Sequence, residues 1–129
     1  MGMEFDTHAV TALVNAFDKA TGGPAIRDVE KVVFRGAIQI KKDAQRRISG
    51  HRRFKRLKYA IDFDMYQSLK GPAAEIGPNH GKPQGNLGHI AEDGSPTSAP
   101  IPYMAPAGQA EEPKFAKAIE DLAAKAFEP

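Results

Sequence analysis

The feature that most constrains the fold is a long helical pattern of apolar residues in the first half of the chain. Apolar side chains recur every three or four residues and so share one face of a helix: Ile26, Val29, Val33, Ala37, Ile40, Ala44 and Ile48. The pattern predicts a helix from Ala25 to Ile48, roughly 36 Å long. Pro24 suits its start, and Ser49-Gly50 suits its end. Such a stripe is usually core; a partner-binding face is the alternative.

Shorter patterns flank this helix on both sides. Met3 to Phe5 is predicted to form a short edge strand, and Val10, Leu13, Val14 and Phe17 predict an amphipathic helix that ends at Thr21-Gly22-Gly23. After the long helix, Leu57, Tyr59, Ile61 and Phe63 alternate with polar residues or alanine. This alternation predicts a strand with one buried face.

The segment after this strand contains several turn signals. Gly71-Pro72 is predicted to be a turn, followed by a short strand from Ala73 to Ile76. Residues 79–85 are predicted to be a loop, and residues 86–91 one helical turn. A hairpin covered by the long helix follows, so the expected fold class is α+β, with helices packed on a small antiparallel sheet.

A proline-spaced segment precedes the C-terminal helix. Pro96, Pro100, Pro102 and Pro106 each fix φ and remove a backbone donor, so residues 95–107 are predicted to form an extended arm. Residues 108–128 are predicted to form a closing helix on the stripe Phe115, Ile119, Leu122 and Ala126, with Pro113 in its first turn. The arm is either a stiff linker or a contact for another molecule.

Three apolar residues of the arm favour the contact with another molecule. Ile101, Tyr103 and Met104 are too apolar to lie free in water, so we expect them to pack on an adjacent copy or on the next ring of an assembly. The predicted interface consists of the arm and the acidic turn before it, namely Ile101, Pro102, Tyr103, Met104, Glu92 and Asp93.

Composition limits the remaining choices. The chain has 129 residues, which suits one domain spanning residues 1–129, and it contains no cysteine, which excludes disulfides and thiolate chemistry. It has no apolar run near the roughly 18 residues that a membrane span requires, so we expect a soluble protein with no membrane partner. The four histidines lack helical metal-site spacing, and the glycine-rich stretch 77–83 fails as a phosphate loop. We therefore expect no metal, no cofactor, no catalytic site and no enzyme activity.

Charge is distributed unevenly along the chain, although its net value is only +2. One basic patch holds nine of the 18 basic residues: Lys41, Lys42, Arg46, Arg47, Arg52, Arg53, Lys55, Arg56 and Lys58. Phe54 lies among these cations, either as a base-stacking residue or as a core anchor. The patch is either a solvated loop, a contact for an acidic protein, or a nucleic-acid site.

The order of these elements resembles the small head-tail joining, neck or tail-completion proteins of long-tailed bacteriophages. The residues that carry the resemblance are Ile90-Ala91-Glu92-Asp93-Gly94 and Pro100-Ile101-Pro102-Tyr103-Met104-Ala105-Pro106-Ala107. The resemblance implies a non-enzymatic virion protein, made in the bacterial cytoplasm, that forms a ring between capsid connector and tail tube.

The partners expected from this resemblance are other copies of the chain, most simply six in a closed ring, and other neck, connector or tail-tube proteins. Passive contact with DNA in the lumen of the ring is a further expectation. The alternative function is a small basic nucleic-acid-binding protein that uses the Lys41 to Lys58 region.

Overall fold

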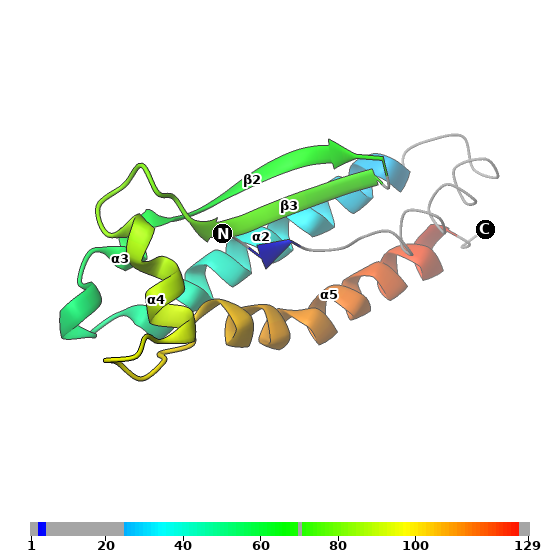
Figure 1. Ribbon diagram of the computed structural model, residues 1–129. Helices are drawn as coiled ribbons and strands as arrows, with labels where there is room; N and C mark the ends of the chain where they lie inside the picture. Colours follow the sequence, from blue (N-terminus) through cyan, green and yellow to red (C-terminus); the bar gives the residue numbers. More distant parts are fainter. Residues whose placement is uncertain (1–2, 5–24, 70, 127–129) are drawn as a thin grey trace.

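The computed structural model of the protein describes residues 3–4, 25–69 and 71–126 (Figure 1). The predicted helix around Val10 to Phe17 lies outside these residues. The described residues combine helices with a small antiparallel sheet, which confirms the α+β class.

Helix α2 (Ala25–Ile48) has the predicted bounds and is the central element of the fold. Its predicted stripe is the core-facing side, since Val29, Val33, Ala37, Ile40, Ala44 and Ile48 are all buried. One side of α2 contacts the sheet and another contacts helix α5 (Met104–Ala126), so the three elements run side by side along the molecule (Figure 1).

The sheet has the strand order β1-β3-β2 and is antiparallel throughout. Strands β2 (Ile61–Ser68) and β3 (Gly71–Pro78) form the hairpin, in a register that places Phe63 opposite Ile76 and Asp64 opposite Glu75. The short strand β1 (Met3–Glu4) pairs with the other edge of β3, as predicted for an edge strand. Strand β2 is therefore the second edge of the sheet.

The prediction of a strand beginning at Leu57 was wrong. Residues Leu57–Ala60 form the short helix α3, and the strand starts at Ile61. Leu57 and Ala60 are both buried at helical spacing, whereas Tyr59, which the alternation placed inside, is 67% exposed. A run of four residues fits both periods, and packing against the end of α2 selects the helical one.

The hairpin is also longer than predicted. Gly71 and Pro72, predicted to be a turn, open β3, which runs for eight residues to Pro78 instead of ending at Ile76. A proline is tolerated at the start of a strand because its missing N–H falls where pairing begins. The short helices η2 (Gly85–Leu87) and α4 (Gly88–Asp93) stand where a helical turn was predicted.

The extended arm was predicted to continue to Ala107, but α5 begins at Met104 and includes Pro106 and Pro113. Residues 95–98 form a tight turn in which the Ser95 N–H donates to the Ser98 carbonyl at 2.9 Å. Residues 99–103, directly before Met104, have no regular secondary structure. Pro106 lies in the first helical turn, where prolines cost little, whereas Pro113 lies inside the helix on an exposed position.

Candidate interaction surfaces

The residues predicted to form an interface in the arm belong mostly to the core of their own chain. Tyr103 is 1% exposed and Met104 is 7% exposed, while Ile101 is half-buried against the same core. The Tyr103 hydroxyl donates to the Gly88 carbonyl at 3.1 Å. Burial, reinforced by the charges of Glu92 and Asp93, raises the pKa of Tyr103. The prediction that Tyr103 and Met104 pack on another molecule was therefore wrong.

Gly88 shows how closely this core is packed around Tyr103. A Cβ atom at Gly88 would lie 2.8 Å from the Tyr103 hydroxyl and 2.4 Å from Cγ of Pro78. Both distances are shorter than a carbon atom tolerates, so the tyrosine can insert only beside a glycine. This dependence joins residues far apart in the sequence, and proline spacing alone could not reveal it.

Glu92 was predicted to lie in an interface, but in the structure its carboxylate binds backbone N–H groups of its own chain. Its carboxylate accepts hydrogen bonds from the backbone N–H groups of Tyr103, Met104 and Ala105 at 3.0, 2.8 and 3.3 Å. A helix start leaves four N–H groups without helical partners, counted from the cap residue. Here the cap residue is Tyr103, and the fourth position is Pro106, which has no N–H group. Glu92 therefore caps α5, while Pro102 and Asp93 remain exposed.

The predicted basic patch divides into two parts. In the first part, carboxylates neutralise the cations: Asp43 binds Arg46 and Arg47, and Asp62 binds Lys82 at 2.9 Å and lies 3.8 Å from Lys41. Burial alone would raise the pKa of Asp43, but hydrogen bonds from Arg47 and Arg46 and their charges outweigh it and lower that pKa. Hydrogen bonds from Lys82 and Asn79, with the charges of Lys82 and Lys41, likewise outweigh burial and lower the pKa of Asp62.

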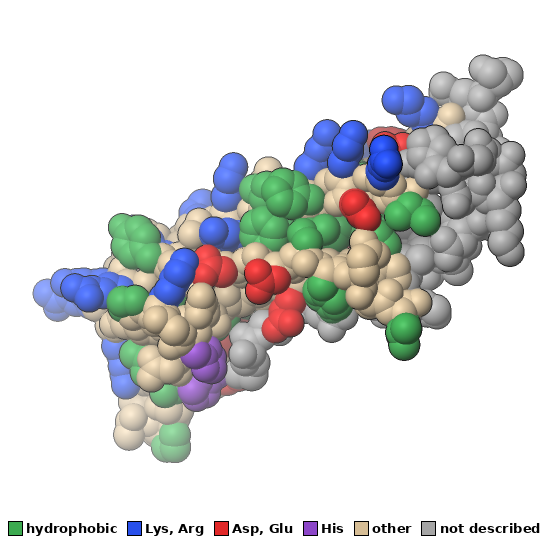
Figure 2. Space-filling view, turned by 90° about the horizontal axis from the view of Figure 1, so that it is seen from above, with side chains coloured by type: hydrophobic (Ala, Val, Ile, Leu, Met, Phe, Trp, Pro, Cys, Tyr) green, Lys and Arg blue, Asp and Glu red, His purple; other side chains and the backbone are tan. Residues whose placement is uncertain are grey.

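The second part is the loop after α2, here called the basic loop and defined as residues 52–56. Its cations Arg52, Arg53, Lys55 and Arg56 are exposed, and within the described ranges none forms an ion pair with a carboxylate. Figure 2 shows Lys and Arg side chains gathered at the end of the molecule where this loop lies, at the left. Lys42 and Lys58 also lack such an ion pair among the described residues.

The basic loop is held in place from inside and from one side. Phe54 is 3% exposed and belongs to the core, which settles its role as an anchor and not as a stacking platform. The side-chain amide of Gln84 donates to the Arg53 carbonyl at 3.1 Å and accepts from the Arg56 N–H at 2.7 Å. Gln84 has φ of 63°, a left-handed conformation that is unusual for a residue other than glycine.

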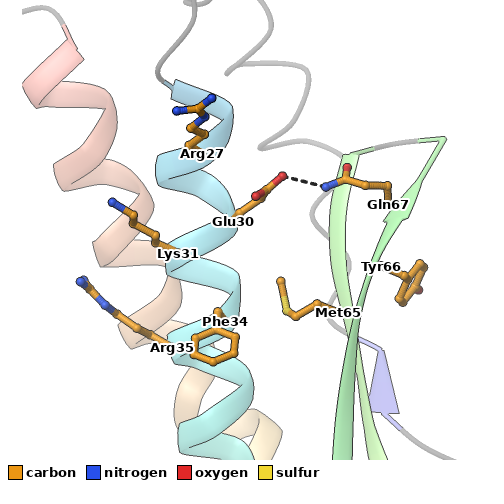
Figure 3. Close-up of a pocket in the computed structure, with 8 residues that line it drawn as sticks. All are labelled: Arg27, Glu30, Lys31, Phe34, Arg35, Met65, Tyr66 and Gln67. Carbon is orange, nitrogen blue, oxygen red and sulfur yellow. Dashed lines mark hydrogen bonds between the residues drawn. The ribbon is translucent and has the colours of Figure 1, made fainter.

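The opposite end of the molecule carries an apolar groove of about 610 Å³ between α2 and the end of β2, here called the hairpin groove. Phe34 and Met65 point into it from the two elements, and Glu30 accepts a hydrogen bond from Gln67 across it at 2.8 Å (Figure 3). Phe34 packs edge-on against Phe63, with ring centroids 5.5 Å apart, yet remains 45% exposed. Sequence periodicity missed the groove because Phe34 lies beside the core stripe.

Charged side chains surround the hairpin groove. Lys31 and Arg35 project from the side of α2 away from β2, Arg27 lies at the first turn of α2, and the three form the outer margin of the groove (Figure 3). The neighbouring surface of the sheet is acidic, since the exposed Asp64 and Glu75 lie opposite one another in the register. Acidic side chains gather in the middle of the face seen in Figure 2.

Comparison of the chain with family models, with curated proteins and with solved structures finds no match. In the described part of the chain, no helix combines the length and the apolarity needed to cross a bilayer. The same residues contain no group of three or more histidines and carboxylates that could hold a metal ion. The basic loop and the hairpin groove are therefore the features of the described residues that bear on function.

Proposed function

We propose that the protein is a non-enzymatic structural subunit of a bacteriophage neck or tail end, which assembles with copies of itself into a ring that joins the capsid connector to the tail tube. The observation that carries the ring is the hairpin groove with its basic margin. The resemblance of the Ile90 to Gly94 and Pro100 to Ala107 segments to phage neck proteins supplies the virion context.

The hairpin end holds most of the large hydrophobic residues that are exposed in the described chain. Three of the four large hydrophobic residues that are exposed lie there: Phe34, Tyr66 and the fully exposed Leu69 at the hairpin tip. Large apolar patches on soluble proteins mark contacts with other molecules. Strand β2 is an edge strand of the described sheet, in which its neighbour is β3. A neighbouring subunit would cover both.

A second copy of this chain is the occupant that the charges favour. The groove margin is basic, and the sheet face bearing Asp64 and Glu75 is acidic. Like charges directly opposite on neighbouring strands destabilise a sheet, so cations from a neighbour would stabilise this face. The two surfaces differ from each other, which makes the contact head-to-tail, and head-to-tail contacts close into rings when the rotation allows. Six copies is the number we expect.

Native mass spectrometry of the purified protein tests the ring. We expect a single closed oligomer that is lost in the Phe34→Asp variant and kept in the matched control Tyr59→Ser, which alters an exposed aromatic at the other end. A protein that stays monomeric at high concentration would contradict the proposal.

Charge reversal tests the head-to-tail geometry. One variant reverses the margin (Arg27→Glu, Lys31→Glu, Arg35→Glu) and another reverses the sheet face (Asp64→Lys, Glu75→Lys). Each alone is expected to be monomeric, because one of its two surfaces is spoiled. Mixed together, the two variants are complementary at both contacts, because the acidic margin of one also meets the basic sheet face of the other, so rings of alternating variants should form. A mixture in which the two variants do not associate would exclude this pairing.

A further inference from the structure

The basic loop is the strongest charged feature that the ring contact does not use. Arg52, Arg53, Lys55 and Arg56 surround one buried residue, Phe54, and they face solvent at the end of α2 opposite the hairpin groove (Figure 1). Cations this close repel one another, and no carboxylate of the described residues neutralises them by an ion pair. Nearby carboxylates do neutralise Lys41, Arg46 and Arg47, so the contrast is local.

The loop is also ordered in a way that favours binding. Gln84 bridges the Arg53 carbonyl and the Arg56 N–H with one amide group, while its own backbone adopts the left-handed conformation. That conformation costs a residue with a side chain about 1 kcal/mol or more. The fold therefore tolerates an unfavourable backbone in order to fix the loop that carries the cations. A fixed array of charges loses less entropy on binding than a flexible one.

The chemistry of the surface favours a phosphate backbone over a protein. Protein interfaces have a core depleted in charge, whereas the exposed side chains of the basic loop are all cationic. Interfaces with DNA are much more positively charged, and their affinity comes largely from Lys and Arg contacts to phosphates. The loop is too short to place a helix in a groove, so it is suited to hold the backbone and not to read bases.

We propose that the basic loop binds the phosphate backbone of double-stranded DNA without sequence preference. The choice of duplex DNA over other polyanions rests on the proposed function, because a neck ring encloses the DNA that passes through it. The binding itself does not require a ring, since each subunit carries the whole loop. Failure of one proposal is therefore distinguishable from failure of the other.

The test measures binding of the full chain to a labelled duplex DNA of arbitrary sequence by fluorescence anisotropy at several salt concentrations. The loop variant is Arg52→Gln, Lys55→Gln, Arg56→Gln, which leaves the Arg53 contact with the Phe54 ring in place. The matched control removes three exposed cations from α5: Lys114→Gln, Lys117→Gln, Lys125→Gln.

We expect the loop variant to bind at least about tenfold more weakly at low salt, and its log-log salt slope to fall by about 2 to 3, because each phosphate contact releases roughly one counterion. The control should change either quantity only slightly. Equal losses in both variants, or no salt-dependent binding by the wild-type chain, would overturn the proposal. So would tighter binding to polyglutamate or to single-stranded RNA of equal length.

A second variant separates the order of the loop from its charge. Gln84→Ala keeps every cation but removes both hydrogen bonds, so we expect affinity for duplex DNA to fall several-fold with an unchanged salt slope. Amide hydrogen exchange in residues 52–56 should become faster in the same variant. Faster exchange without loss of affinity would show that the fixed conformation of the loop is irrelevant to binding.

Discussion

The two ends of helix α2 present opposite surfaces. At its N-terminal end, the hairpin groove exposes apolar side chains beside the edge strand β2. At its C-terminal end, the basic loop exposes cations around a single buried anchor, Phe54. Apolar surface is suited to a protein neighbour, and cations without counterions are suited to a polyanion. One helix can therefore hold two surfaces of different chemistry far apart.

The middle of the molecule carries the stability that both ends depend on. The described core continues along α2 from Val29 to Ile48 and includes Tyr103 and Phe115 of the C-terminal part. Neither the cations of the basic loop nor Leu69 contributes to it. Substitutions in the middle should therefore unfold the protein, whereas substitutions at the ends should alter binding alone.

The largest effect is expected for Tyr103→Ala, which would break the comparison at its centre. Removing this buried ring should cost about 3 to 5 kcal/mol of unfolding free energy, through lost burial and the cavity left behind. Urea denaturation measures it, with Pro102→Ala, at an exposed neighbour, as the control. A Tyr103→Ala protein with normal stability and defective assembly would restore the interpretation of residues 95–107 as an arm that contacts another molecule.

A smaller loss is expected for Glu92→Ala. This change leaves the N–H groups of Tyr103, Met104 and Ala105 without their acceptor and should cost about 1 to 2 kcal/mol. Asp93→Ala, which alters an adjacent exposed carboxylate, should stay within about 0.5 kcal/mol. Circular dichroism during urea titration distinguishes them. Equal effects would mean that general negative charge, and not the cap, stabilises the start of α5.

A still smaller loss of stability is expected at acidic pH, where Asp43 and Asp62 become protonated and no longer pair with the cations of the basic patch. The folded-state pKa values of Asp43 and Asp62 are lowered, so their contribution to stability is present above the unfolded pKa of about 4 and is lost as pH falls through the lower folded values. Each partly exposed group should contribute at most about 1 kcal/mol. Denaturation midpoints between pH 6 and pH 3 measure the loss, which Asp43→Asn should reduce. An unchanged pH profile in Asp43→Asn would exclude the ion pairs of Asp43 with Arg46 and Arg47 as a cause of the loss.

The smallest changes in stability are expected at the two ends. Leu69→Ser should leave unfolding free energy within about 0.5 kcal/mol, because that side chain is fully exposed. Neutralising Arg52, Lys55 and Arg56 should raise stability slightly at low salt by removing repulsion, and added salt should abolish the gain. Thermal denaturation at two salt concentrations measures both. Strong destabilisation by either change would show that the ends belong to the core.

The sequence by itself determined the elements whose signals are local. The stripe from Ile26 to Ile48 specified α2 to the residue, since a spacing of three and four residues is sufficient to define one helix face. The presence of two strands and the α+β class followed from the alternation of apolar residues, although Leu57–Ala60 is helical and the predicted turn residues Gly71 and Pro72 belong to β3. The exposed cations at residues 52–56 were also evident, because a dense run of arginine and lysine cannot be buried.

Only the tertiary structure decided the rest, because those outcomes depend on residues distant in sequence. Leu57–Ala60 fits a strand or a helix equally well until the end of α2 packs on it. From sequence alone, residues 95–107 are predicted to form an extended arm that contacts another molecule. In the structure Gly88 leaves space for Tyr103, and Glu92 caps the helix that begins at Met104. The hairpin groove joins segments more than 25 residues apart, and so do the hydrogen bonds from the Gln84 side chain to Arg53 and Arg56. Local propensity contains no information on such contacts, since they form only when the chain closes around one core.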